Sequence, residues 1–113
     1  MPIAAILSIS DNGIGYQWFT EKGKLRHTGL IQWDAVAAVD VFKRDMFTLD
    51  LICAQISGNE QDPIEFDEED PNWEDLIESL SSRLPGCKPW TEWFSEVAFP
   101  AFEMKAQRIF ERR

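Results

Sequence analysis

Apolar residues in the first half of the chain come in short runs that are separated by turn residues. The first run is followed by Asp11-Asn12-Gly13, a combination typical of a tight turn. The runs are rich in β-branched and aromatic residues, which favour strands. The expected strands are Ile3–Ile9, Tyr16–Thr20, Leu25–Leu30, Ala37–Phe42, Leu49–Ile56 and Ile64–Asp67, the last alternating with its acids outward.

The second half changes to a helical period. Apolar residues at spacings of three, four, seven and eleven from the first make one stripe, which consists of Trp73, Leu76, Ile77, Leu80 and Leu84. Asp70 is expected to be the N-cap of this helix and Pro71 its first residue. Pro85-Gly86 is expected to end it. The opposite face would carry Glu74, Asp75 and Glu78.

The residues after this helix suggest a short second one and a packed tail. One or two amphipathic turns are indicated by Trp90, Trp93, Phe94 and Val97. The tail, Ala101–Arg113, is expected to dock on the domain, because its bulky residues Phe102, Ile109 and Phe110 would be costly to leave in water. The pattern as a whole predicts an α+β fold, with a curved antiparallel sheet of about six or seven strands followed by a C-terminal helix and a docked tail.

Length and composition fit one globular domain over residues 1–113. A hydrophobic fraction of 44% with five Trp and eight Phe can build a core. No apolar run reaches the roughly 18 residues of a membrane span, and the start lacks the basic segment of a signal peptide, so a cytoplasmic location is expected. Cys53 lies in an apolar run and Cys87 in a turn, and reduced thiols are favoured over a disulfide.

Negative charge is concentrated in one stretch. The chain has 20 acidic and 11 basic residues, a formal net charge of −9, and ten of the acids lie between Glu60 and Glu78 with no Lys or Arg among them. Such a chain repels phosphate backbones and anionic headgroups, which argues against nucleic acid and membranes as partners and favours a basic protein surface. The alternative is that the acids only solvate an edge strand and a helix face.

Signatures of catalysis or metal binding are absent from the sequence. His27 is the single histidine, and together with only two cysteines it cannot supply the four ligands of a structural zinc site. The run Asp67-Glu68-Glu69-Asp70 lacks the spacing and glycine of a calcium loop, and Gly13-Ile14-Gly15 lacks the rest of a phosphate loop. We therefore expect that the protein is not an enzyme and that it binds no cofactor or metal. A less favoured alternative is an enzyme that uses a pair of carboxylates.

Two features favour recognition of a partner. The first is the acidic stretch, whose candidate contact residues are Glu65, Asp67, Glu68, Glu69, Asp70, Glu74, Asp75 and Glu78. The second is the pair Trp90 and Trp93, since Trp is enriched in binding hot spots, although such spacing is also typical of a core. A separate charged segment, Lys43-Arg44-Asp45, would form an internal ion pair, or charge lock, if Lys43 or Arg44 pairs with Asp45 or Asp50.

Several short motifs resemble those of a group of small uncharacterised bacterial proteins. They lie between Leu30 and the end of the chain, and none is a catalytic signature. Alanines at positions 35, 37 and 38 are smaller than that pattern favours. The motifs are Trp33-Asp34-Ala35-Val36, Phe42-Lys43-Arg44-Asp45, Asp50-Leu51-Ile52-Cys53, Trp73-Glu74-Asp75-Leu76, Leu84-Pro85-Gly86, Trp93, Val97-Ala98-Phe99-Pro100-Ala101-Phe102 and Ile109-Phe110-Glu111-Arg112.

The resemblance implies a function that composition alone does not. Proteins of this type resemble immunity proteins encoded beside secreted antibacterial toxins, as in Rhs or type VI secretion loci. Their strand-rich half followed by a helix is also similar to pleckstrin-homology-like domains, a binding platform that does not fix a function. We therefore expect an immunity protein that binds a cognate toxin through its acidic surface. The alternative is a small regulatory or adaptor domain of pleckstrin-homology-like fold that binds a non-toxin protein.

Overall fold

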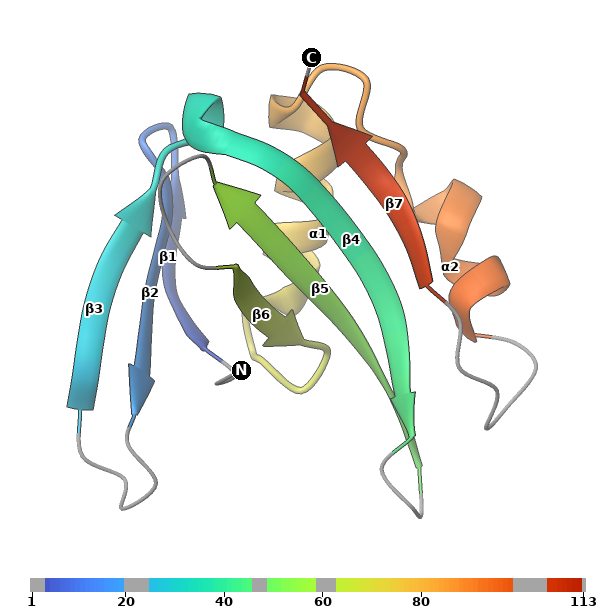
Figure 1. Ribbon diagram of the computed structural model, residues 1–113, viewed down its shortest axis with the longest axis horizontal. Coiled ribbons are helices and arrows are strands. Elements are labelled where there is room, and N and C mark those ends of the chain that lie inside the picture. The colour runs from blue at the N-terminus through green and yellow to red at the C-terminus, as the bar shows by residue number, and fades with distance from the viewer. Residues whose placement is uncertain (1–3, 20–24, 46–48, 59–62, 99–105, 113) are drawn as a thin grey trace.

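The computed structural model describes residues 4–19, 25–45, 49–58, 63–98 and 106–112, which form two antiparallel sheets and two α-helices (Figure 1). The first sheet has the order β1-β2-β3 and contains β1 (Ala5–Ser10), β2 (Gly13–Phe19) and β3 (Leu25–Ile31). The second has the order β6-β5-β4-β7 and contains β4 (Val36–Asp45), β5 (Asp50–Gly58), β6 (Ile64–Asp67) and β7 (Ala106–Glu111). The helices are α1 (Trp73–Arg83) and α2 (Trp90–Ala98). The α+β class is confirmed.

The strands divide into two sheets, so the expectation of one curved sheet is wrong. A 3-10 helix, Trp33–Ala35, separates β3 from β4 and redirects the chain. It is held against the first sheet because Trp33 Nε1 donates a hydrogen bond to the carbonyl oxygen of Ser10 at 2.8 Å. The hydrophobic pattern could not show this turn, because three residues are too few to have the period of a strand or a helix.

The turn between β1 and β2 depends on a glycine. Gly13 has φ +140°, and a Cβ there would lie 2.1 Å from the carbonyl oxygen of Ile31 on β3. A side chain would therefore meet both an unfavourable backbone conformation and a clash with the third strand. The turn signal in the sequence thus fixes how closely the strands of this sheet approach.

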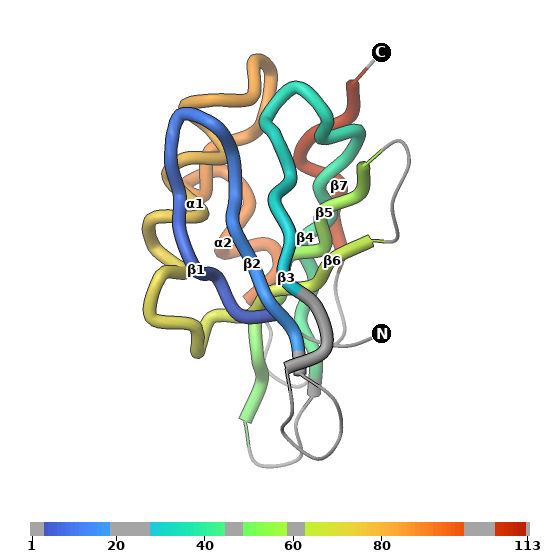
Figure 2. The backbone as a smooth tube through the Cα atoms, turned by 90° about the vertical axis from the view of Figure 1, so that its left-hand side faces the viewer, coloured from blue at the N-terminus to red at the C-terminus, as the bar shows by residue number. Residues whose placement is uncertain are grey.

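Both helices lie on one side of the four-stranded sheet (Figure 1), and Figure 2 shows α1 beside β1. The apolar stripe of α1 enters the core as predicted, with Leu76 and Leu80 fully buried. α2 adds Trp93 and Val97, each 1% exposed. Burial of a large apolar side chain contributes roughly 1.5–3 kcal/mol. One connected core therefore joins both helices to both sheets.

The end of the chain forms a strand. The short second helix indicated after α1 is confirmed as α2, but the chain then adds a strand instead of an irregular docked tail: β7 pairs antiparallel with β4 from Phe42↔Ala106 to Ala38↔Glu111. Docking of the tail is confirmed in this form, since Ile109 and Phe110 are buried, whereas Phe102 lies outside the described residues. Arg112 holds the strand in place with hydrogen bonds to the carbonyl oxygens of Val36 and Trp33.

The start of α1 differs from the expected capping. The N-cap is Asn72, not Asp70, and Pro71 precedes the helix. Asp70 has another role: one of its carboxylate oxygens accepts from the backbone N–H of Ile6 at 2.8 Å and the other from that of Asn72 at 2.9 Å. Asp70 therefore ties the turn before α1 to β1.

Charged residues on β4, β5 and β6 form two ion pairs, Lys43 with Asp50 and Arg44 with Glu65, which together we call the paired region. Lys43 is 1% exposed, and its Nζ lies 3.5 Å from Asp50 Oδ2 and donates to the carbonyl oxygen of Ala98. The charge lock proposed from the sequence is confirmed for Lys43 and Asp50. Arg44 pairs instead with Glu65 at 2.7 Å.

The expectation that both acids of β6 face outward is wrong for Glu65, which is only 2% exposed. Glu65 and Asp67 do alternate with the buried Ile64 and Phe66. The face that carries Glu65 is covered, however, and the pairing with Arg44 offsets the cost of burying its charge.

None of the helices in the described ranges is long and apolar enough to span a bilayer.

Candidate functional site

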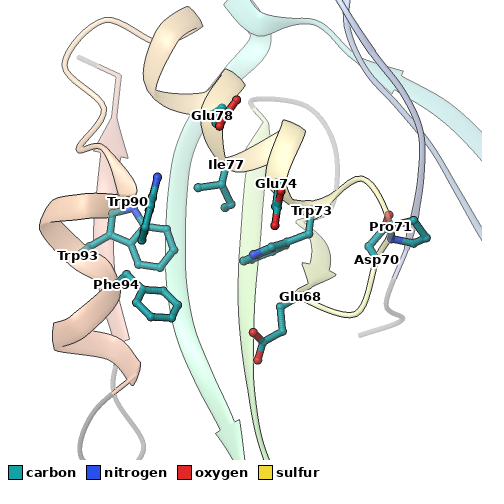
Figure 3. Close-up of a pocket in the computed structure, with 10 residues that line it drawn as sticks. All are labelled: Glu68, Asp70, Pro71, Trp73, Glu74, Ile77, Glu78, Trp90, Trp93 and Phe94. Atoms are coloured by element: carbon teal, nitrogen blue, oxygen red, sulfur yellow. The ribbon is translucent and has the colours of Figure 1, made fainter.

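An open groove lies between α1 and α2 beside the turn that precedes α1 (Figure 3). It has a volume of about 530 Å³. Its walls combine acidic and aromatic side chains, and none of the ten residues that line it is basic. They are Glu68, Asp70, Pro71, Trp73, Glu74, Ile77, Glu78, Trp90, Trp93 and Phe94.

The aromatic side chains occupy different depths because of their helix positions. Trp93 points into the core and is 1% exposed, so it forms part of the floor. Trp90, three positions earlier, is 46% exposed and stands at the rim. Its ring meets that of Phe94 edge-on, at 5.7 Å between centroids and 84° between planes. From the other side, Trp73 extends from the first turn of α1 toward Trp90 and Phe94 (Figure 3).

Four acids of the groove fall into two kinds. Asp70 uses both carboxylate oxygens to accept backbone hydrogen bonds, and Glu68 Oε1 accepts from the N–H of Ile52 at 2.9 Å. Glu74 and Glu78 are exposed, one turn apart on α1, and their carboxylates make no hydrogen bond or ion pair with any residue that the structure describes. These two carboxylates are therefore available to a ligand.

The eight acids predicted as contact residues are only partly brought together. Glu68, Asp70, Glu74 and Glu78 line the groove. Glu69 and Asp75 are exposed but lie outside it. Asp67 is half-buried on β6 and accepts from the N–H of Glu69, and Glu65 is buried in the paired region.

The groove also unites two features that the sequence offered separately, the acidic stretch and the Trp90/Trp93 pair. Sequence reasoning placed Trp73 in the core stripe and did not select Ile77, Phe94 or Pro71 for recognition. Trp73 is half-buried because it lies in the first helical turn, where the stripe reaches the edge of the core. The spacing of four between Trp90 and Phe94 was the available signal for an aromatic pair on one helix face.

The two thiols lie elsewhere. Burial, and then the charge of Glu65, raises the pKa of Cys53 from 9.0 to about 11. Burial alone raises that of Cys87 to about 11. Both cysteines are free and buried, so their thiols stay protonated at neutral pH and are poor nucleophiles.

Carboxylates beside the exposed indole ring of Trp90 have the chemistry to attract a cation. Across the described ranges, no three His, Cys, Asp or Glu side chains are placed to hold a metal ion. An organic cation that can also contact aromatic faces fits the groove better, because its charge meets Glu74 and Glu78 while its apolar part meets the rings.

Comparisons of the chain with protein-family models, with curated proteins and with solved structures returned no match.

Proposed function

We propose that this protein is an immunity protein, acting in the cytoplasm of the producing cell, that binds and neutralises a cognate antibacterial toxin of the Rhs or type VI kind. The groove between α1 and α2 would receive a basic segment of the toxin. The observation that carries the proposal is the juxtaposition of the Glu74 and Glu78 carboxylates, which have no partner among the described residues, with the exposed ring of Trp90.

The charge distribution supports a basic protein as the partner. A net charge of −9 attracts a cationic surface from a distance, and the acids around the groove would orient it. Glu69 and Asp75, exposed nearby, add to this field without lining the groove. Association should therefore be fast and should slow as ionic strength rises.

The exposed tryptophan supports a specific contact. A half-exposed Trp beside a cavity can bury a large area at a low cost in side-chain entropy, which is why Trp dominates many interfaces. We assign direct contact to Glu68, Glu74, Glu78 and Trp90. Glu65 is inaccessible in the paired region, and Asp70 is committed to holding β1.

The proposal is tested by co-expression with the product of the neighbouring gene, followed by pull-down and growth rescue. Reversal of both free acids, Glu74→Lys with Glu78→Lys, should weaken toxin binding about 100-fold and abolish rescue. The matched control is Asp75→Lys with Glu92→Lys, which changes net charge equally with exposed acids outside the groove. It should cost no more than about fivefold through the long-range field.

The stoichiometry of neutralisation separates the remaining readings. Rescue that saturates at one copy of this chain per toxin supports inhibition by binding, whereas neutralisation far below one equivalent would indicate an enzyme. Binding of a basic protein without any rescue would favour the adaptor reading. Equal effects of the groove and control reversals would contradict this placement of the contact surface.

A further inference from the structure

We infer that the groove between α1 and α2 is a receptor for a single arginine side chain of the partner. Its guanidinium would lie over the indole of Trp90 and pair with the carboxylates of Glu74 and Glu78. This rests on the proposed function only in that the arginine would belong to the toxin.

The volume and the apolar floor of the groove suit a long side chain with an apolar stem. Its volume, about 530 Å³, falls within the roughly 300–1,000 Å³ of sites that hold small ligands. The floor is apolar: Trp93 and Ile77 are almost fully buried, and the half-buried Phe94 lies beside Trp93. Arginine buries its methylene groups on such a floor and leaves its charge near the rim.

The rim carries what a guanidinium needs. Glu74 and Glu78 follow each other by one helical turn on α1, and across the opening Trp90 presents its ring from α2 (Figure 3). The Phe94 ring packs nearly perpendicular to the Trp90 ring, at 84° between planes, and so limits the orientations of the indole. Two like charges one turn apart repel each other, so a cation between them removes an unfavourable interaction as well as adding favourable ones.

Arginine fits this rim better than lysine does. Its planar guanidinium stacks on aromatic faces and presents a fork of donors that can meet two carboxylates at once, whereas an ammonium acts as a point charge and holds its water more strongly. The mixture of flat rings and separate carboxylates therefore selects for the guanidinium.

Elsewhere in the protein, an arginine side chain contacts an indole ring and a carboxylate at the same time. Arg83, at the end of α1, lies over the ring of Trp33 at 5.7 Å, and its Nη2 donates to Asp11 Oδ1 at 2.7 Å. One arginine thus contacts an indole and a carboxylate together. The groove offers the same two partners from Trp90 and the α1 acids, with the cation left to be supplied from outside.

The test uses Nα-acetyl-arginine amide as the probe, titrated into the whole chain labelled with ¹⁵N while the indole N–H signals of the five tryptophans are followed by NMR. The signals of Trp90 and Trp73 should shift and that of Trp18, on β2, should not. The neutral isostere Nα-acetyl-citrulline amide should bind at least about tenfold more weakly, and the lysine analogue several-fold more weakly.

Variants locate the site. Trp90→Leu should weaken binding of the arginine probe about fivefold, and Glu74→Gln with Glu78→Gln about tenfold. The control, Asp75→Asn with Glu92→Gln, should stay within twofold of the unchanged chain. All four acids and Trp90 are exposed, so these chains should fold, which circular dichroism checks.

The inference is overturned if citrulline binds as well as arginine, if lysine equals arginine, or if the shifts fall on Trp18 instead of the groove. Its failure differs from that of the proposed function. Loss of toxin binding on charge reversal without a groove response to the arginine probe would leave the function standing and remove the receptor. A groove-specific response to the arginine probe without toxin neutralisation would leave the receptor standing and remove the proposed function.

Discussion

Glu65 and Glu78 belong to the same acidic stretch, yet they lie in opposite electrostatic settings. Glu65, in the paired region, is buried and bonded to Arg44, which comes from another strand. Glu78, with Glu74, lies on an exposed helix face and has no partner among the described residues. Both lie in a stretch of the sequence that contains ten acids and no Lys or Arg. What differs is whether the fold brings a cation to the acid, and only the acids left without one can serve a partner.

The largest test of this difference removes a cation from the paired region. Lys43→Ala would remove the ion pair with Asp50, which is 14% exposed, and the hydrogen bond to the carbonyl oxygen of Ala98. Breaking a buried pair in this way should lower the free energy of unfolding by about 3 kcal/mol, measured by urea denaturation.

The control for this change is an exposed pair. Arg108, 49% exposed, bonds to Asp40 and Glu111 on the surface, so Arg108→Ala should lower the free energy of unfolding far less than Lys43→Ala does. Equal losses in the two variants would show that burial does not separate these pairs.

The stability of the chain at high pH depends on Cys53, which lies beside Arg44 and Glu65 of the paired region, and on Cys87. Since the pKa of each thiol is raised from 9.0 to about 11 in the folded chain, the unfolded chain loses its thiol protons first as pH rises. The folded state then binds more protons, so stability is intact below about pH 9 and falls through the window up to about pH 11. Burial also raises the pKa of Tyr16, with the same sign.

We expect a loss on the order of 2 kcal/mol per thiol across this window, measured as urea midpoints at pH 8, 9.5 and 10.5. A chain carrying Cys53→Ala and Cys87→Ala should be less stable at pH 8, because both sites are buried, but should show a shallower fall with pH. An unchanged slope would mean that the thiols do not cause the loss.

The sequence predicted individual elements well where one period governed a segment. The stripe from Trp73 to Leu84 and the six expected strands each correspond to an observed element. It missed β7, because Ala106-Gln107-Arg108 has no strand pattern of its own and becomes a strand by pairing with β4, more than sixty residues earlier. It also missed the division into two sheets, which a three-residue turn produces.

The site was predictable to the same extent. The acids and Trp90/Trp93 were selected by residue type and local spacing, but their meeting in one groove depends on how α1 packs beside α2. Glu65 was misplaced because its burial is set by Arg44, a contact between separate strands. Local patterns therefore identify candidate groups, and long-range pairing decides which remain free.

The smallest effect gives the sharpest contrast, because one isosteric substitution should have opposite signs in the two settings. Glu65→Gln removes the charge that Arg44 pairs with and should lower the free energy of unfolding by about 1 kcal/mol. Glu78→Gln removes a like-charge contact with Glu74 and should raise it by about 0.3 kcal/mol at low salt, an effect that fades in 1 M salt. Thermal unfolding at both salt concentrations measures each change. A change in stability of the same sign in both variants would contradict the contrast. Changes of opposite sign would mean that the free chain tolerates a small repulsion between Glu74 and Glu78. A cationic partner would relieve that repulsion on binding.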